Sequence, residues 1–232
     1  MKLYELAFAC YVYSHMTNYD SSFLDLINNT RPGLDLNNAS HRMELLVWLN
    51  SWGCRQFAVD HHEMASEEIM KWHEDFKDLL FPEDKDLTSL SEIDFRVIKT
   101  AYSSLCSKIA SIRTLRNGNT TNVVVGPTGA AKILFAIRPN ALIPWDEPIR
   151  NKFELDGDGN SYVKYLLIVI NHLKELSNEC RRNNFELSDL PRKLNRPSSS
   201  VTKLIDEYYW VTVSRGCPAP SGNELKIWIS WA

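Results

Sequence analysis

The stretch that decides the fold is VVGPTGAAKIL, residues 124–134, which is followed nine residues later by IPWD, residues 143–146. Gly126 and Gly129 flank a proline, and together they predict a tight turn that opens a helix, because glycine adopts backbone angles that other residues avoid. This helix should run over about residues 128–138 and stop before the next proline. The IPWD segment then places an acid where the N-cap of a further helix belongs.

The rest of the chain is helical almost throughout, because apolar residues recur at spacings of three and four. A capping-box pattern, Ser89 with Glu92, precedes a stripe that continues to about Leu115. The strand-like patterns are three consecutive valines at residues 123–125, which predict a short strand near residues 121–125, and an alternation over residues 225–231, which is either a strand or a docked tail. We expect helices over about residues 3–14, 21–28, 40–53, 63–80, 92–115, 128–138, 147–155, 161–182 and 201–213.

These elements predict an all-α fold with two lobes and at most a short strand. Residues 1–95 would form an N-terminal helical lobe and residues 96–184 a central lobe around the glycine turn. Residues 185–232 would pack back on the N-terminal lobe to give one compact unit. A length of 232 residues is enough for such a unit to bury a core without disulfides or metals.

Composition excludes several classes of protein. Hydrophobic residues make up 44% and charged residues 24%, which is ordinary globular usage and not that of a disordered or fibrous chain. The five cysteines are scattered without a C-x-x-C pair, which is typical of reduced thiols. No apolar stretch reaches the roughly 20 residues that a bilayer requires. We therefore expect a cytoplasmic protein with no membrane contact, no obligate protein partner and no metal site.

Charge is distributed unevenly along the chain. From Lys108 to Lys152 there are seven basic and two acidic residues, a charge of +5. The other residues include 19 basic and 27 acidic ones, a charge of −8, so the total is −3. We interpret this as a middle segment that faces phosphate on a body that repels it, although clustering on solvated helix faces would give the same numbers.

The glycine turn and the acid after it form a constellation that carries chemistry. A turn that opens a helix presents free backbone N–H groups, which bind phosphate or a monovalent cation that bridges to phosphate. Asp146 follows within one short helix and connector. As a plain N-cap it would only bind backbone, whereas beside a bound nucleic acid its carboxylate could act on the sugar.

This segment resembles the helix-hairpin-helix DNA glycosylase superfamily, in which a hairpin L-P-G-hydrophobic-G is followed by a small Ala, an aliphatic helix and then P-x-D. Gly126 corresponds to the second glycine, Ala130 to the Ala, and Asp146 to the catalytic Asp twenty residues on. The resemblance covers about 30 residues. Val124 replaces the first hairpin glycine, and Thr128 stands where bifunctional members carry a lysine, which indicates a monofunctional enzyme.

The resemblance implies a glycosylase-like two-lobed fold and a DNA glycosylase that flips a base out of double-stranded DNA and hydrolyses its N-glycosidic bond. Asp146 would stabilise the cationic sugar and orient water. The excised base is either an ordinary damaged base or a hypermodified one, such as a glucosylated cytosine of phage DNA removed in antiviral defence. The alternative is a catalytically inactive helix-hairpin-helix module that only binds DNA or a partner.

Further candidates surround this segment. Lys132 is a possible second catalytic group or a phosphate contact. Trp145 is a core aromatic or a base contact, while Arg55 and Gln56 either read a base edge or cap the preceding helix. The predicted contacts to the DNA backbone are Gly126, Thr128, Gly129, Lys132, Arg138 and Arg150. The predicted base pocket or wedge comprises Trp145, Trp52, Trp48, Arg55 and Gln56, and no cofactor is expected beyond a monovalent cation at the turn.

Overall fold

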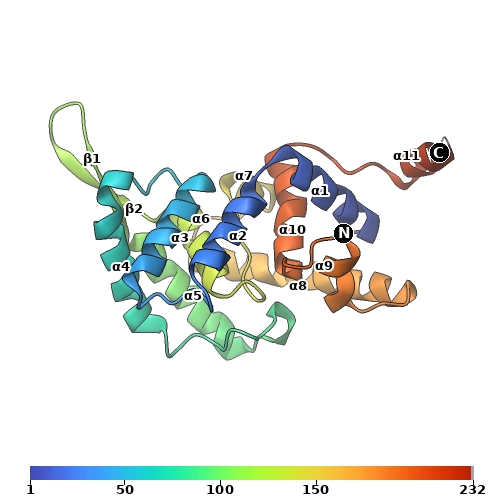
Figure 1. The fold of residues 1–232 in the computed structure, drawn as a ribbon, viewed down its shortest axis with the longest axis horizontal. Coiled ribbons are helices and arrows are strands. Elements are labelled where there is room, and N and C mark those ends of the chain that lie inside the picture. Colours follow the sequence, from blue (N-terminus) through green and yellow to red (C-terminus); the bar gives the residue numbers. More distant parts are fainter. Residues whose placement is uncertain (231–232) are drawn as a thin grey trace.

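The computed structural model describes the backbone of residues 1–230 and the side chains of residues 1–226. Helices account for 63% of the chain, and the described residues contain one sheet, of two strands. The predicted all-α class with a short strand is therefore confirmed. Figure 1 shows an elongated bundle of helices from which a β-hairpin projects at one end and the last helix at the other.

Five helices build the first part of the chain: α1 (Leu3–Met16), α2 (Tyr19–Asn29), α3 (Ala39–Ser51), α4 (His62–Phe76) and α5 (Glu92–Ser107). Polar caps fix two of their starts. The Asn38 side chain accepts a hydrogen bond from the backbone N–H of Ser40 at 2.9 Å, at the start of α3. At the start of α5 the capping box is formed by Ser91 and Asp94, two residues later than the predicted pair.

The segment after α5 differs from the prediction. The helix does not continue to Leu115 but ends at Ser107, and strands β1 (Ile109–Thr114) and β2 (Thr120–Val124) follow as an antiparallel hairpin. An Asn-Gly turn joins the strands, with Gly118 at a φ of +81°. Both strands are rich in β-branched residues, which pack better on a pleated surface than in a helix, so pairing prevails over the helical spacing.

The central helices are α6 (Gly126–Ile137), α7 (Glu147–Lys152) and α8 (Gly159–Arg182). The middle of α6 is enclosed, since its residues from Ala130 to Phe135, apart from Lys132, have no exposed surface. Helices α3 and α5 pack against it. The glycine turn at its start therefore lies where several elements converge.

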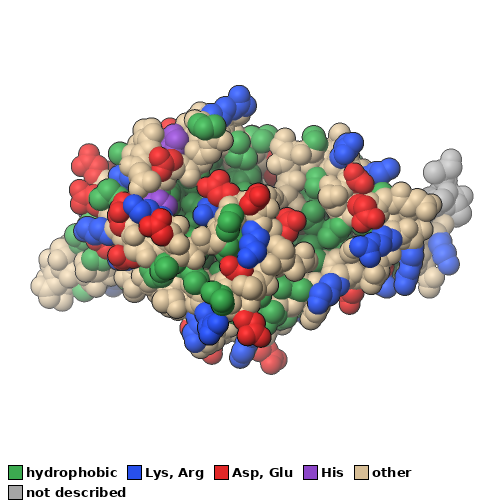
Figure 2. Space-filling view, turned by 90° about the horizontal axis from the view of Figure 1, so that it is seen from below, with side chains coloured by type: hydrophobic (Ala, Val, Ile, Leu, Met, Phe, Trp, Pro, Cys, Tyr) green, Lys and Arg blue, Asp and Glu red, His purple; other side chains and the backbone are tan. Residues whose placement is uncertain are grey.

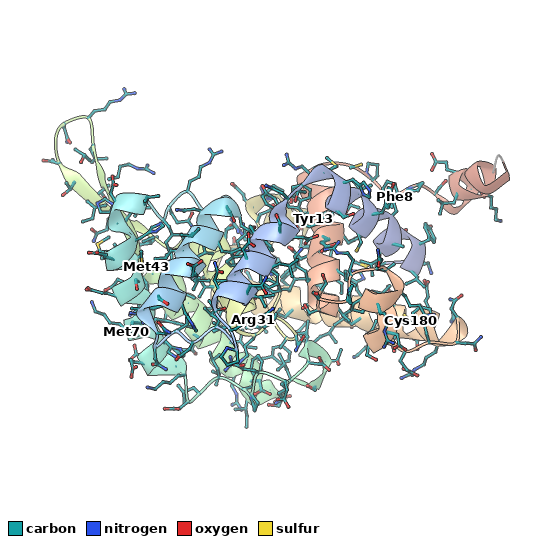
Figure 3. The ribbon with its side chains drawn as sticks, viewed as in Figure 1. Phe8, Tyr13, Arg31, Met43, Met70 and Cys180 are labelled. Atoms are coloured by element: carbon teal, nitrogen blue, oxygen red, sulfur yellow. The ribbon has the colours of Figure 1, made fainter. Side chains whose placement is uncertain are left out.

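The C-terminal elements are α9 (Leu190–Lys193), α10 (Val201–Tyr209), a π-helical turn (Trp210–Ser214) and α11 (Gly222–Ser230). Helix α10 packs against α1, and Tyr13 lies at that contact, with its ring centre 4.2 Å from Nζ of Lys203 (Figure 3). The alternating pattern near the C-terminus forms a helix and not a strand as far as residue 230. Trp231, which belongs to that pattern, lies outside the described residues.

One large apolar core runs through the molecule. It extends from Leu6 in α1 through Trp72 and Leu134 to Leu204 in α10. The expected lobe boundary at residues 95–96 falls inside α5. Within residues 1–230, the structure contains no helix with the length and apolar character that crossing a membrane requires.

Candidate active site

A pocket of about 210 Å³ opens where α1, α6, α7 and α10 meet. Two carboxyl groups, Asp146 and Asp206, and the amine of Lys132 line it. The remaining lining residues are mainly aromatic or small: Tyr13, Tyr19, Trp52, Gly53, Thr128, Pro144, Trp145, Ile149 and Trp210. Paired acids within an aromatic enclosure distinguish this pocket as the candidate active site.

Asp146 is held from two sides. Its Oδ1 accepts the backbone N–H of Ile149 at 3.0 Å and so caps α7, as the sequence predicted. Its Oδ2 accepts the hydroxyl of Ser214 at 2.6 Å, from the π-helical turn. The N-cap role and the pocket position thus coincide, because both bonds fix the carboxylate while it lines the pocket.

Asp206 is the acid that sequence reasoning missed. It lies on α10 and is 7% exposed. Burial raises its pKa to about 6, and the neighbouring Glu207 and Asp146 act in the same direction, whereas Lys203 and Lys132 oppose the shift. The only available signal was an Asp-Glu pair inside an otherwise apolar helix, Leu204 to Tyr209.

The wall behind Asp206 is an ion cluster that we define as Asp20, Arg196, Lys203 and Glu207. Glu207 is fully buried and accepts two hydrogen bonds from Arg196, at 2.7 and 2.9 Å, and one from Lys203 at 3.0 Å. Asp20 binds Arg196 from α2. The cluster therefore fastens α10 to α2 and to the loop before α10.

The aromatic wall places the predicted tryptophans differently. Trp145 and Trp52 both line the pocket, but Trp48 lies in the core behind Trp52, with ring centres 4.6 Å apart. Trp48 is therefore not a base-pocket residue. The structure adds Trp210 and the tyrosines of α1 and α2, which come from parts of the chain far from the glycine turn.

Trp145 is tied to the start of α6. Its Nε1 donates to the hydroxyl of Tyr102 at 3.1 Å and to the carbonyl of Pro127 at 3.3 Å. Its ring stacks on Tyr165, with 5.3 Å between ring centres. Only 1% of Trp145 is exposed, so it is a core aromatic that presents one edge to the pocket.

Lys132 and Arg150 each contact a tryptophan of the pocket wall. Lys132 Nζ donates to the backbone carbonyl of Trp52 and lies 5.7 Å from the centre of the Trp52 ring. Arg150 donates to the Thr128 hydroxyl at 3.0 Å and covers the Trp145 ring at 5.6 Å. These contacts tie parts of the pocket wall together, and Lys132 adds positive charge near Asp206.

The glycine turn is built for close packing. Gly126 has a φ of +67°, which favours glycine. A Cβ at Gly129 would lie 2.6 Å from Nε2 of Gln56, which itself donates to the carbonyl of Val125 at 2.8 Å. Gln56 therefore fastens the α3–α4 loop to the turn and is not aimed at a base. Arg55 is exposed and does not line the pocket.

Arg138 does not belong to this site. It stands just after α6, about 18 Å along the helix axis from Gly126. Its Nε donates to the carbonyl of Phe81 at 2.8 Å, and Nη1 pairs with Glu83 at 3.4 Å. The predicted contact with the DNA backbone is replaced by a structural one, which links α6 to the segment after α4.

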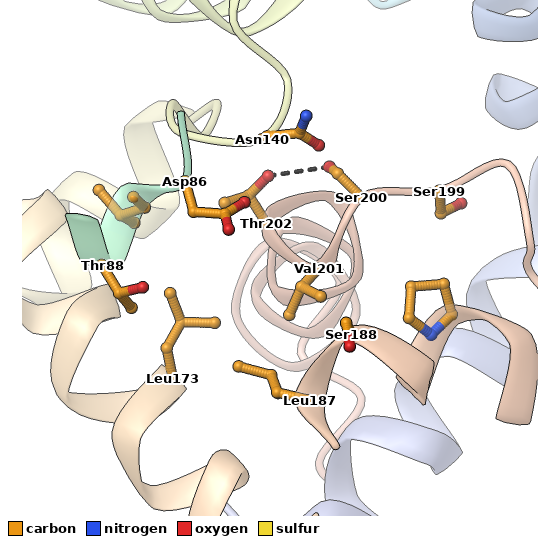
Figure 4. A pocket seen from close by; sticks show the side chains of 12 residues that line it. Asp86, Thr88, Asn140, Leu173, Leu187, Ser188, Ser199, Ser200, Val201 and Thr202 are labelled. Carbon is orange, nitrogen blue, oxygen red and sulfur yellow. Dashed lines mark hydrogen bonds between the residues drawn. The ribbon is translucent and has the colours of Figure 1, made fainter. Parts of the chain in front are cut away.

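A second pocket, of about 310 Å³, lies near the start of α10 (Figure 4). Hydroxyl groups of Thr88, Ser188, Ser200 and Thr202 surround an apolar floor. Ser200 caps α10, and its hydroxyl also contacts that of Thr202 at 2.9 Å. Among the described residues, Asp86 is the only ionisable one in this lining, so the acid pair of the first pocket has no counterpart there.

Among the described residues, no group of three or more His, Cys, Asp or Glu side chains is arranged to hold a metal ion. Comparison with known proteins adds no assignment: no family model, curated protein or solved structure matches the chain.

Proposed function

We propose that this chain is a monofunctional DNA glycosylase and that the flipped base enters the pocket beside Asp146. The observation that carries the proposal is the meeting of two acids, a lysine and aromatic walls at the start of α6 and α7. The same segment carries the sequence resemblance to the glycosylase superfamily. A pocket of about 210 Å³ is smaller than the 300–1,000 Å³ typical of drug-sized ligands and suits a single base.

The chemistry needs a carboxylate beside the sugar. Breaking an N-glycosidic bond builds positive charge on the sugar ring, which a fixed carboxylate stabilises in a site shielded from water. Two hydrogen bonds, from the backbone N–H of Ile149 and the Ser214 hydroxyl, fix the Asp146 carboxylate in the pocket, and neither donor carries a formal positive charge. The same carboxylate can then orient the attacking water.

A lysine nucleophile has less support. The Thr128 hydroxyl accepts a hydrogen bond from Arg150, and Lys132 donates one to the backbone carbonyl of Trp52. An amine that donates to a carbonyl is not poised to attack a sugar carbon. This arrangement favours hydrolysis over Schiff-base chemistry.

The connection between α5 and α6 departs from the superfamily pattern. A β-hairpin of residues 109–124 stands between the two helices where a short turn would be expected. The face seen in Figure 2 carries basic and acidic side chains side by side, without a large patch of one sign. These features favour the second candidate, a DNA-binding or interaction module without activity, and the experiment below distinguishes the two.

The test is base release from DNA. Unmodified genomic DNA, damaged oligonucleotides and phage DNA with modified cytosines are incubated with the protein, and free bases are identified by mass spectrometry. We expect release by the unaltered protein and at least about a hundredfold less by Asp146→Asn. Asp158→Asn is the matched control, because Asp158 caps α8 through the N–H of Ser161 at 2.7 Å, away from the pocket.

Asparagine is itself a good N-cap, so both variants should fold. Release by Asp146→Asn at the unaltered rate would refute the role of Asp146. DNA binding without release from any of these DNAs would favour the inactive module.

A further inference from the structure

Asp206 differs from the other buried acid of α10 in what it contacts. Among the described residues no side chain or backbone group donates a hydrogen bond to it, and its one ion pair, with Lys203, is 3.6 Å long. It nevertheless lines the pocket that contains Asp146. Its carboxyl is therefore available to a ligand, whereas Glu207 next to it is occupied by Arg196 and Lys203.

We propose that Asp206 is the acid that protonates the departing base while Asp146 stabilises the sugar. This inference rests on the proposed glycosylase function. It assigns different tasks to two carboxyl groups of one pocket, which is the usual division in glycosidic hydrolysis.

The bond between the sugar C1′ and the base nitrogen breaks, and its electron pair goes to the base. The Asp206 proton passes to a nitrogen or oxygen of that base, which leaves neutral. Water adds its oxygen to C1′ and gives a proton to Asp146, and one proton returns to Asp206 through solvent. The sum is one water consumed, one free base and one abasic site.

The surroundings of Asp206 suit a proton carrier. Burial raises its pKa to about 6, so an appreciable fraction of the carboxyl holds a proton near neutral pH. Titratable groups of both signs surround it. They are Lys203 and Glu207 on α10, Lys132 on α6, Asp146 at the start of α7 and Tyr13 on α1, with Asp20 and Arg196 behind Lys203 and Glu207.

The first readout is the titration of the Asp206 carboxyl, followed by carbon NMR in the full chain. We expect a midpoint near 6, and a lower midpoint in Asp146→Asn, because that variant removes a neighbouring negative charge. A midpoint near 4, or one that ignores Asp146→Asn, would overturn the proposal without reference to activity.

The second readout is single-turnover base release against pH. Release by the unaltered protein should fall about tenfold per pH unit above the midpoint. Base release by Asp206→Asn should be slower by about 10²- to 10⁴-fold and should not fall with pH in this way. Asp206→Glu should retain the fall of the rate at high pH. An Asp206→Asn variant that is as fast as the active unaltered protein would overturn this inference alone. An unaltered protein that releases no base would overturn the proposed function and this inference together.

Discussion

Asp206 and Glu207 are neighbours on α10, yet their surroundings are opposite. Glu207 has no exposed surface and is paired with both Arg196 and Lys203. Asp206 faces a pocket and has one distant ion pair. The ion pairs of Glu207 fix the helix in place. The Asp206 carboxyl, in contrast, has no cation at hydrogen-bond distance among the described residues. Such uncompensated acids are found mainly where chemistry is done.

Two sets of contacts fasten α10 and the turn after it at the edge of the pocket. The ion cluster fastens α10 to α2, while Asp146 holds the turn after α10 through Ser214. The wall that α10 contributes is thereby fixed on one side by the ion cluster, which lies behind Asp206, and on the other by Asp146, which itself lines the pocket. A rigid support of this kind keeps catalytic groups in position.

Removing the paired acid should have the largest effect. Glu207→Gln leaves two cations buried with less compensation, so we expect the free energy of unfolding to fall by about 3–5 kcal/mol. Urea denaturation measures this change. Glu175→Gln is the control, since Glu175 is 59% exposed and its ion pair with the N-terminus should contribute less than about 1 kcal/mol. Equal losses for both variants would show that the cluster is not what fixes α10.

Removing the Asp206 carboxyl should have the opposite effect and stabilise the fold. The folded-state pKa of Asp206 is about 6, above the ordinary 3.8, so this group costs stability as pH rises from about 4 to 6. Asp206→Asn should therefore raise the free energy of unfolding at pH 7 by about 1–3 kcal/mol. The gain should vanish below about pH 4, where both states are protonated. A loss of stability at pH 7 would mean that Asp206 is compensated as Glu207 is.

A smaller effect is expected on DNA binding, where the arginines near the two ends of α6 should differ. Arg150 lies by the glycine turn, whereas Arg138 is committed to Phe81 and Glu83. If DNA binds at the turn, Arg150→Ala should remove one phosphate contact. The slope of log K against log salt concentration should then become shallower by about one unit. Arg138→Ala should leave that slope unchanged. Fluorescence anisotropy over a range of salt concentrations measures both, and identical slopes would place the DNA elsewhere.

Local chemistry made much of the fold predictable. Asp146 as the N-cap of α7 and the stop of α6 before Pro139 followed from the residues alone. The β-hairpin did not, because Ile109 and Ile112 continue the helical spacing of α5 and only pairing with residues 120–124 decides between helix and strand.

The candidate site was predictable only in part. Asp146, Lys132 and Trp145 lie close together in sequence and were found. Asp206 reaches them because the π-helical turn after α10 packs against α7, where Ser214 binds Asp146 across 68 residues of sequence. Trp48 and Trp52 are one helical turn apart, so spacing cannot tell which of them faces the pocket. Tertiary packing decides both questions.

In the proposed mechanism, Asp146 stabilises a cationic sugar beside this pocket. Binding of duplex DNA that carries a pyrrolidine in place of one sugar tests it most directly, because this cation mimics the transition state whichever base is excised. We predict binding at least about tenfold tighter than to plain duplex, a preference lost in Asp146→Asn and kept in Asp158→Asn. Equal affinity for both duplexes, or a preference that survives Asp146→Asn, would contradict the account.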